Sequence, residues 1–532
     1  MFLFESKNKY DIIIIGGGIS GLFLSYKLSK TNFKILLIES DKAFGGRVHT
    51  VEKNKIKYEC AAARFNDNHT KLKTLINELN LEDKMITLPK EIKYVLRGYK
   101  KNYQYRTENK LDLNELLQNS IKERKNFNDF TLQNITFFQY LVDIYDNETA
   151  CFIKDAFGYD SEFLFLNALA AIDMFNEDLF SDKDYYILGG GLSQIIENLL
   201  KNIKKHKNVT MILGEKVNQI YSEYIETNKT KYYYENLICT IPKHNLKEFT
   251  LLKNIPEIDS VDGHPLLRIY AKYPVKDLWF KNLKRTTTDN LIRQIIPIDY
   301  SNGLIMISYT DGEYAKMLNK AYFNGEDYLI RIIHQEIKDL LKLNPPEPEF
   351  LAVHYWDVGL HLWKPGYNME LNSKKIIKPF PEKNIFICGE TYSKKQGWME
   401  GSLDTCYDVL NILPLLKDNF EITTDNNVIN LEDITKKITD EKKIFTIEEI
   451  IKENNLVIMD INNEKRVYDI SSWAPIHPGG SMIIKAVDAN KYYLNKKGKS
   501  PKKLWLEYHS EELFKKFFIE QNEYIQQVGI LK

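Results

Sequence analysis

The chain has 532 residues, enough for three or four domains of ordinary size. Apolar residues make up 43% of it and charged residues 27%, which is ordinary globular usage and excludes collagen-like and wholly disordered chains. Its 73 Lys and Arg residues balance its 73 Asp and Glu residues, so no excess of charge indicates a nucleic-acid partner or an anionic membrane.

The cysteines and the N-terminal sequence favour a reducing compartment. Five cysteines is an odd number, and no C-x-x-C pair occurs, which disfavours a disulfide framework and a zinc ribbon. The uncharged stretch 12–26 is shorter than the roughly 20 residues of a membrane helix. Acidic Glu5 and Asp11 precede it where a signal peptide would be basic. We therefore expect a soluble, cytoplasmic protein without a membrane span.

The first forty residues predict a strand, a glycine turn, a helix and a second strand. Residues 10–15 and 33–38 are short, apolar, β-branched runs typical of strands buried on both faces. The turn between them has the pattern G-x-G-x-x-G and reads Gly16-Gly17-Gly18-Ile19-Ser20-Gly21. Glu39 ends the second strand, 18 positions after the last glycine of the turn. This order and spacing are typical of a dinucleotide-binding βαβ unit.

Each residue type in the turn has a physical reason. Gly16 permits the tight turn, Gly18 lets the backbone approach a pyrophosphate, and Gly21 allows close packing of helix on strand. The free N–H groups at the helix N-terminus, which begins at about Ile19 and Ser20, attract phosphates. Glu39 is suited to accept hydrogen bonds from ribose hydroxyls.

The rest of the chain alternates between helical and strand-like stretches. Residues 66–184 look largely helical, 186–250 contain a glycine turn, a helix and several strands, and 264–310 alternate as strands do. A strand at 384–388 precedes a glycine turn and a helix from about 400 to 416. Residues 417–442 are polar and highly charged, which favours a linker. About 90 residues with their own apolar pattern follow it.

Further motifs indicate which dinucleotide the glycine turn would bind. The sequence reads Phe44-Gly45-Gly46-Arg47-Val48, then YECAAAR at 58–64, ICGET at 387–391 and GWMEGS at 397–402. Together these strings resemble the FAD-dependent amine oxidase family, over about residues 8–416. That family includes monoamine, polyamine and L-amino acid oxidases and protoporphyrinogen oxidase.

The resemblance implies an α/β and α+β multidomain fold. A Rossmann-type FAD-binding domain would be built from segments 8–65, 186–250 and 375–416. A substrate domain of mixed sheet and helices would be inserted in it as residues 66–185 and 251–374.

The resemblance also implies positions for the cofactor. Gly45, Gly46 and Gly389 would expose backbone to the flat ligand, and Arg47 would lie at the pyrophosphate or the flavin. The other implied contacts are Glu390 at the ribityl chain or pyrophosphate, Met399 along the isoalloxazine edge, and the backbone of Val217 at the adenine. Family members with covalent flavin carry a Cys in the stretch that corresponds to 356–367, which has none here. Non-covalent FAD is therefore expected.

On the substrate side, the resemblance implies an aromatic cage. Trp398 would form one wall, and Tyr367, or else Trp363, the other. Arg64 matches an arginine that holds the substrate carboxylate in L-amino acid oxidases, although a phosphate contact or a more distant role is an equal alternative. Arg268 stands where the family often has a Lys near the reactive flavin nitrogen.

The C-terminal segment carries a second set of motifs. A strand is expected at 466–470, followed by WAPIHPGG at 473–480 and YHS at 508–510. These residues resemble the cytochrome b5 family over about 443–532, a small α+β domain. The resemblance implies a b-type haem held by His477 and His509. The two histidines are 32 positions apart, more than the family usually has, with the excess in Lys-rich 490–503. A related fold without haem remains an alternative.

Together these motifs predict an FAD-dependent oxidoreductase that oxidises the C–N bond of a small amine or amino acid by hydride transfer. Electrons would pass to the haem, to another redox partner or to oxygen. One alternative is a dehydrogenase similar to protoporphyrinogen oxidase or a desaturase. A second is a redox or structural protein that keeps the fold without turnover.

Overall fold

The computed structural model describes residues 8–53, 56–90, 92–96, 112–179, 183–414, 443–445, 456–461, 464–469 and 526–531. The chain divides into two compact units, residues 1–419 and 420–532. Among the described residues, none of the helices is both long enough and apolar enough to cross a membrane.

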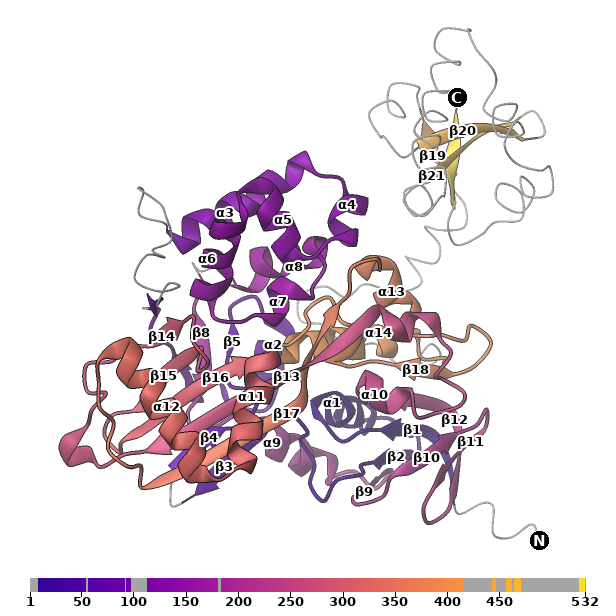
Figure 1. The fold of residues 1–532 in the computed structure, drawn as a ribbon. Helices are drawn as coiled ribbons and strands as arrows, with labels where there is room; N and C mark the ends of the chain where they lie inside the picture. Colours follow the sequence, from indigo (N-terminus) through magenta and orange to yellow (C-terminus); the bar gives the residue numbers. More distant parts are fainter. Residues whose placement is uncertain are drawn as a thin grey trace, which may run out of the picture. The chain divides into compact units, whose positions relative to one another are not determined.

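A seven-stranded mixed sheet carries the N-terminal glycine turn (Figure 1). Its strands are β1 (Lys9–Ile15), β2 (Ile35–Ile38), β9 (Val209–Ile212), β10 (Val217–Ile220), β11 (Tyr224–Thr227), β12 (Lys231–Cys239) and β18 (Ile385–Ile387). β1 lies between β2 and β12, parallel to both, and Ile15 stands opposite Ile38 and Cys239. β18 extends the parallel part along β12, while β10 and β11 form an antiparallel hairpin. The carboxyl ends of β1, β2, β12 and β18 therefore meet at one edge.

Burial on both faces explains the continuous apolar run in β1. Ile12 and Ile14 pack in one core and Ile13 and Ile15 in the other. The first core lies under α1 (Ile19–Leu28), which packs against α9 (Ser193–Ile203) and α14 (Met399–Ile412). The expected strand–turn–helix–strand unit is present.

A second, six-stranded sheet forms another part of the first unit (Figure 1). In sheet order its strands are β17 (Phe350–Trp363), β13 (Val261–Lys272), β16 (Leu304–Asp311), β15 (Gln294–Asp299), β14 (Thr286–Thr288) and β7 (Lys93–Val95). Leu267, Ile269 and Ala271 of β13 pack in one core with α11 (Gly312–Phe323) and α12 (Glu326–Leu341). Because side chains alternate along a strand, Arg268 and Tyr270 face away from those helices.

A group of helices packs around aromatic side chains (purple in Figure 1). They are α3 (Leu113–Glu123), α4 (Asp129–Asn134), α5 (Phe137–Ile144), α6 (Asn147–Phe157), α7 (Ser161–Leu164) and α8 (Ala168–Met174). Phe137, Phe163 and Phe175 lie with ring centroids 4.8–5.5 Å apart. Thr136 and Gln139 form a capping box that fixes the start of α5. The middle of the chain is thus helical as expected, but β7 of the sheet and β6 also come from it.

Short elements connect these layers. The strands are β3 (Thr50–Lys53), β4 (Ile56–Glu59), β5 (Phe65–Asn66), β6 (Met85–Thr87) and β8 (Tyr185–Leu188). The helices are α2 (Thr70–Glu78), α10 (Lys243–Leu246) and α13 (Met369–Lys375). Single turns are η2 (Glu82–Lys84), η3 (Arg124–Asn126), η4 (Phe175–Leu179), η5 (Pro256–Ser260), η6 (Val275–Asp277) and η7 (Glu390–Tyr392).

The second unit contains a four-stranded sheet among its described residues. In sheet order the strands are β19 (Lys443–Phe445), β22 (Gln526–Leu531), β21 (Glu464–Asp469) and β20 (Leu456–Ile461). β21 is the strand expected at 466–470, and its Val467 and Tyr468 are buried. The expected haem ligands His477 and His509, and the expected linker 417–442, lie outside the described residues.

Candidate functional site

The glycine turn joins β1 to α1 and leaves open space at the helix N-terminus. A Cβ on Gly21 would lie 1.9 Å from the Gly16 carbonyl oxygen, so only glycine allows this contact between turn and helix. Gly18 caps α1 without a side-chain hydrogen bond, and a Cβ there would find its nearest atom, the Gly45 oxygen, 4.0 Å away. The backbone at Gly18 therefore faces a space that no side chain fills.

Glycines from two other segments border the same space. The Gly45 N–H donates to the Gly17 oxygen over 2.9 Å, and a backbone bridge pairs Gly18 with Gly45. A Cβ on Gly46 would lie 3.5 Å from the Gly18 Cα. Gly389 follows β18 at the same sheet edge. Three chain segments thus present bare backbone around one opening.

Glu39 lies at the end of β2, beside the turn. One carboxylate oxygen accepts from the Gly17 N–H over 2.6 Å, and the other accepts from the Asp41 N–H over 2.8 Å. The Glu39 carbonyl oxygen accepts from the Glu215 N–H over 3.0 Å, two residues before Val217 begins β10. Glu39 and Val217 therefore border the same corner of the sheet.

Glu390 is the centre of a buried polar cluster. Its carboxylate accepts from Arg47 Nη1 over 2.8 Å, from the His361 N–H over 2.9 Å and from the Gly397 N–H over 3.0 Å, and contacts His361 Nδ1 at 3.0 Å. Burial alone would raise the pKa of this carboxyl. The Arg47 charge and the contacts with His361 outweigh burial and hold the pKa well below its usual range. Glu390 is thus ionised and positions Arg47.

His361 is a buried residue that the sequence analysis did not select. It is completely buried in β17, and its Nε2 has no hydrogen-bond partner among the described residues. A buried polar atom without a partner indicates a missing ligand or water. The glycine-lined opening at a helix N-terminus and this orphan atom beside Glu390 and Arg47 fit a dinucleotide with a polar flat ring, as FAD has.

Trp398 and Met399 begin α14 beside this cluster. Met399 is 6% exposed, and Trp398 is the N-cap residue and half-buried. The Trp398 ring contacts two others, with centroids 4.7 Å from His69 and 6.4 Å from Tyr185. The rings beside Trp398 are therefore those of His69 and Tyr185, and the sequence analysis selected neither of them.

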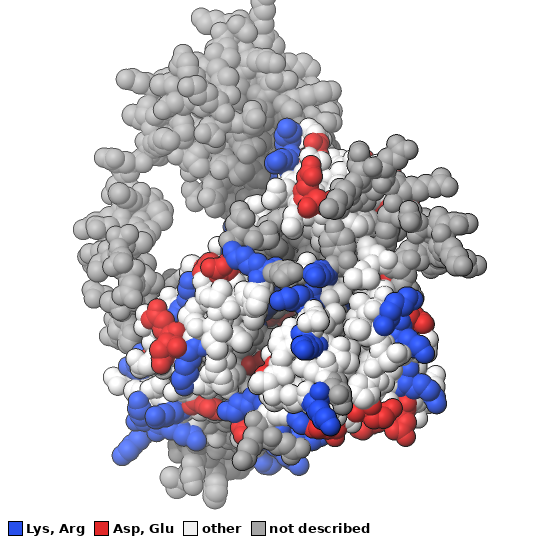
Figure 2. Space-filling view, turned by 90° about the vertical axis from the view of Figure 1, so that its left-hand side faces the viewer, with Lys and Arg blue, Asp and Glu red and all other residues white. Residues whose placement is uncertain are grey.

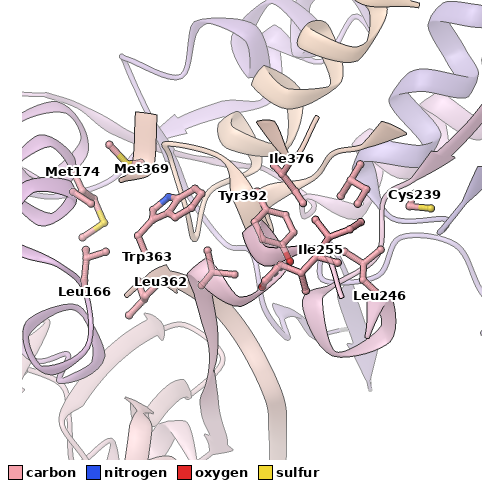
Figure 3. Close-up of a cluster of buried hydrophobic side chains, with 14 of the residues drawn as sticks. Leu166, Met174, Cys239, Leu246, Ile255, Leu362, Trp363, Met369, Ile376 and Tyr392 are labelled. Carbon is pink, nitrogen blue, oxygen red and sulfur yellow. Dashed lines mark hydrogen bonds between the residues drawn. The ribbon is translucent and has the colours of Figure 1, made fainter. Parts of the chain in front are cut away.

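The structure places Tyr367 and Trp363 elsewhere. Trp363 is 1% exposed and packs in the hydrophobic cluster of Figure 3, and its Nε1 donates to the Ser393 oxygen over 3.0 Å. The Tyr367 ring contacts the Lys364 ammonium at 5.2 Å. Neither has a ring contact with Trp398 among the described residues. Trp363 is a core residue, while Tyr367 as the second wall of the cage stays a prediction, because two rings that flank a substrate need not contact each other.

Two of the expected site residues, Arg64 and Arg268, lie against tyrosine rings. The Arg64 guanidinium stacks on the Tyr185 ring, 4.9 Å from its centroid. Arg268 donates to the Tyr309 hydroxyl over 3.3 Å and to the Glu59 carbonyl oxygen over 3.2 Å. The Ala62 N–H donates to the Arg47 oxygen over 3.0 Å, which ties the segment carrying Arg64 to the cluster around Glu390.

Comparison with known sequences matches this chain to one family. The model of the flavin-containing amine oxidoreductase family matches residues 19–407. Human flavin-containing amine oxidase B is 27% identical over 100 residues, 19% of each chain, so the match spans about a fifth of that curated relative. An uncharacterized protein of Acanthamoeba polyphaga mimivirus is 21% identical over 476 residues, which cover 75% of this chain and 93% of that protein.

Solved structures share the fold of the first unit. A putrescine oxidase bound to putrescine matches with a TM-score of 0.60 at 14% identity, over 76% of this chain and 99% of the other. An Exiguobacterium protein assigned as a protoporphyrinogen oxidase matches with a TM-score of 0.58 at 14% identity, over 75% and 99%.

Proposed function

Because this chain belongs to the flavin-containing amine oxidoreductase family, we propose that it uses FAD to oxidise the C–N bond of a small amine or amino acid. The observation that carries the proposal is the opening lined by Gly18, Gly45 and Gly389 next to the Glu390–Arg47–His361 cluster. Such an opening suits a dinucleotide, and the cluster lies beside the N-terminus of α14.

In this proposal the residues around this opening hold FAD without a covalent bond. The N–H groups at the start of α1 bind the pyrophosphate, and Glu39 accepts from the ribose. The backbone beside Val217 borders the adenine, while Arg47 and His361 donate to polar atoms of the cofactor. Met399 lies along the ring edge. Glu390 keeps Arg47 and His361 in place, because their contacts with its carboxylate fix both side chains.

The chemical step needs little from the protein beyond positioning. FAD, when bound, accepts the hydride from the carbon next to nitrogen. The C–H bond would break with both of its electrons going to the cofactor, the nitrogen would then release one proton to solvent, and the product would be an imine that water hydrolyses. Trp398 and Tyr185, whose ring centroids lie 6.4 Å apart, would border the space for the substrate. No strong base is required, because an amine that binds in its neutral form loses its proton to solvent.

The alternative is oxidation of a C–C or ring C–N bond, as in a protoporphyrinogen-oxidase-like dehydrogenase. A fold shared with the Exiguobacterium protein agrees with either reaction. Anaerobic mixing of the purified protein with amines, amino acids and porphyrinogens separates them, because loss of flavin absorbance with one class identifies the substrate. Reduction by amines or amino acids is expected. Reduction by porphyrinogens alone would overturn the proposal, and reduction by none would favour a protein without turnover.

We further propose that the second unit binds b-type haem through His477 and His509 and receives electrons one at a time. The sequence motif supports this, and so does the strand β21 that leads toward it. The full chain should show low-spin bands of a bis-histidine haem, and His477→Ala should remove them without loss of flavin absorbance. Purified protein that contains flavin but takes up no haem would contradict this half of the proposal.

A further inference from the structure

Two loops of the first unit bring six lysines together at the edge of the seven-stranded sheet opposite the glycine turn. One loop joins α1 to β2, and the other, with the last turn of α9, leads into β9. Because β2 and β9 are parallel neighbours, both loops lie at the amino ends of the strands. All six side chains are exposed, and we call them the lysine patch: Lys30, Lys34, Lys201, Lys204, Lys205 and Lys207.

Hydrogen bonds hold the two loops beside each other. The side-chain amide of Asn208 donates to the carbonyl oxygens of Thr31 and Phe33 over 2.8 and 2.9 Å. The Asn208 carbonyl oxygen accepts from the Ile35 N–H over 2.8 Å. Lysines that are far apart in the sequence therefore share one surface, and their arrangement is fixed by the fold.

No acidic residue of the two loops neutralises this patch. The loop sequences, 29–34 and 201–208, contain neither Asp nor Glu. Within the described part of the chain, no ion pair within 4.0 Å involves five of the six, namely Lys30, Lys201, Lys204, Lys205 and Lys207. On the face of the molecule shown in Figure 2, by contrast, cationic and acidic residues are interspersed.

The ends of two helices explain only part of the patch. The C-termini of α1 and α9 both lie at these loops, and the C-terminus of a helix attracts cations. Each end carries about half a negative charge, so two ends offset about one of the six positive charges. Lys201 and Lys204, three positions apart at the end of α9, also repel each other. Most of the positive charge is therefore left to attract an anionic partner.

The side chains of the patch suit a broad charged surface better than a nucleic acid. Lysine ammonium groups lack the fork with which arginine grips one phosphate. Helix C-termini present carbonyl oxygens, whereas proteins that contact nucleic-acid phosphates often present N–H groups of helix N-termini. The nearby rings of Tyr10 and Tyr26 are buried, with lysine ammonium groups over them, so they cannot stack on bases. An anionic bilayer attracts lysines through its surface potential and needs none of these contacts.

We propose that the lysine patch docks this protein reversibly on a bilayer that contains anionic phospholipid. The glycine-lined opening lies at the carboxyl ends of β1 and β2, so docking leaves it accessible. The balanced charge of the whole chain conceals the patch, because the compensating acids lie elsewhere. The inference is independent of the proposed reaction, since none of its tests uses turnover.

The first test measures vesicle binding of the full-length protein. Vesicles of phosphatidylcholine, alone or with a third of phosphatidylserine, are mixed with the protein and sedimented. At low ionic strength the protein should sediment with the anionic vesicles and stay in solution with the neutral ones. Raising the ionic strength from about 0.1 M to about 1 M should release it, because the Debye length falls from about 10 Å to about 3 Å.

The second test removes charge from the patch. Each lysine near an anionic surface strengthens binding about fivefold, so Lys204→Gln/Lys207→Gln should lower the vesicle partition coefficient about 25-fold. Lys281→Gln/Lys320→Gln removes equal charge from two exposed lysines outside the patch and is the matched control. It should change binding less than about twofold, because distant charges are screened. Lys204→Arg/Lys207→Arg keeps the charge and should bind as the unmodified protein does. The melting temperature of each variant should be unchanged.

The remaining outcomes would overturn the proposal. Equal sedimentation with neutral and anionic vesicles, or sedimentation with neither, excludes electrostatic docking on a bilayer. If the patch variant binds normally, or if the control loses as much binding as the patch variant does, the lysine patch is not the docking site. Duplex DNA is compared with the vesicles at equal phosphate concentration. Tighter binding to the duplex that is lost in Lys204→Gln/Lys207→Gln would make a nucleic acid the partner of the patch.

Discussion

The Glu390 side chain shows how a single buried charge can organise a site. It is 5% exposed and is surrounded by Arg47, His361 and two backbone N–H groups. Because its folded-state pKa is depressed, the unfolded chain binds the extra proton first as the pH falls. The stabilisation is therefore fully present above the ordinary carboxyl pKa of about 4.3 and is lost below it.

Glu390→Gln should destabilise the protein most at neutral pH. Replacing the carboxylate leaves Arg47 without its counter-charge, which costs about 3 kcal/mol for a buried pair. The gap to the unmodified protein should shrink by about 1.4 kcal/mol for each pH unit below about 4. Urea unfolding of the FAD-free protein at pH 6 and at about pH 3.5 measures this. Glu313→Gln, at an exposed ion pair with Lys316, should show no pH-dependent gap. A gap at position 390 that does not depend on pH would mean that this carboxyl is not ionised.

Two tryptophans near the site should respond differently to truncation. Trp398 is half-buried and borders the proposed substrate space, so Trp398→Ala should lower turnover more than FAD content. Trp363 is 1% exposed in the core, so Trp363→Ala should cost about 3–5 kcal/mol of unfolding free energy and lower both together. Bound FAD per chain, kcat and melting temperature are measured for each variant. Equal loss of turnover and FAD in Trp398→Ala would mean that this ring only packs.

Residues within a local motif could be predicted, and residues brought together by strand pairing could not. Gly18 and Glu390 stand in short strings with fixed neighbours, so the sequence selected them. Tyr309 faces Arg268 only through the register of β13 and β16, and a single sequence does not specify register. Tyr185 was missed because nothing in β8, a strand of four residues, distinguishes it from a core residue.

At the level of elements, two glycines of the strand–turn–helix unit should have different roles, one in folding and the other in cofactor binding. Gly21→Ala would place a methyl group 1.9 Å from the Gly16 oxygen and should lower the melting temperature sharply or prevent folding. Gly18→Ala adds the same methyl where the nearest atom is 4.0 Å away and φ is −73°, which alanine adopts freely. The FAD-free Gly18→Ala protein should therefore melt as the unmodified protein does.

FAD binding is the second measurement on Gly18→Ala. The added methyl group would occupy the space proposed for the pyrophosphate, so affinity should fall about tenfold or more, as expected when close backbone approach is lost. Quenching of flavin fluorescence gives the dissociation constant. Normal FAD affinity in Gly18→Ala would show that the pyrophosphate does not lie at this glycine.

The length of an element decided how well the sequence predicted it. The seven-residue apolar strand β1 and the 14-residue helix α14 begin and end within a few residues of the expected positions. In the stretch 66–184, expected to be largely helical, β6 and β7 have three residues each. Three residues are fewer than one helical turn and too few to show the alternation of a strand, so only tertiary pairing reveals such strands.

At the scale of the whole molecule, two compact units predict two unfolding transitions. A ligand stabilises only the unit that binds it, by an amount that grows with its concentration over its dissociation constant. FAD should therefore raise the melting temperature of residues 1–419 and leave the other transition unchanged. Differential scanning calorimetry with and without added FAD tests this. A single transition that shifts as a whole would mean that the two units unfold together.

The first unit draws its dinucleotide sheet from distant parts of the chain. β18 pairs with Leu237–Cys239 of β12 only after the whole substrate sheet has been made, and it precedes Gly389 and Glu390. Ribosomes add about 5–20 residues per second, so the first strands are synthesised many seconds before β18. A nascent chain that stops before residue 385 carries the glycine turn but lacks the acid that holds Arg47. Cofactor capture can therefore follow only near-complete synthesis of this unit, and a truncated product is left without the stabilisation that FAD provides, open to degradation.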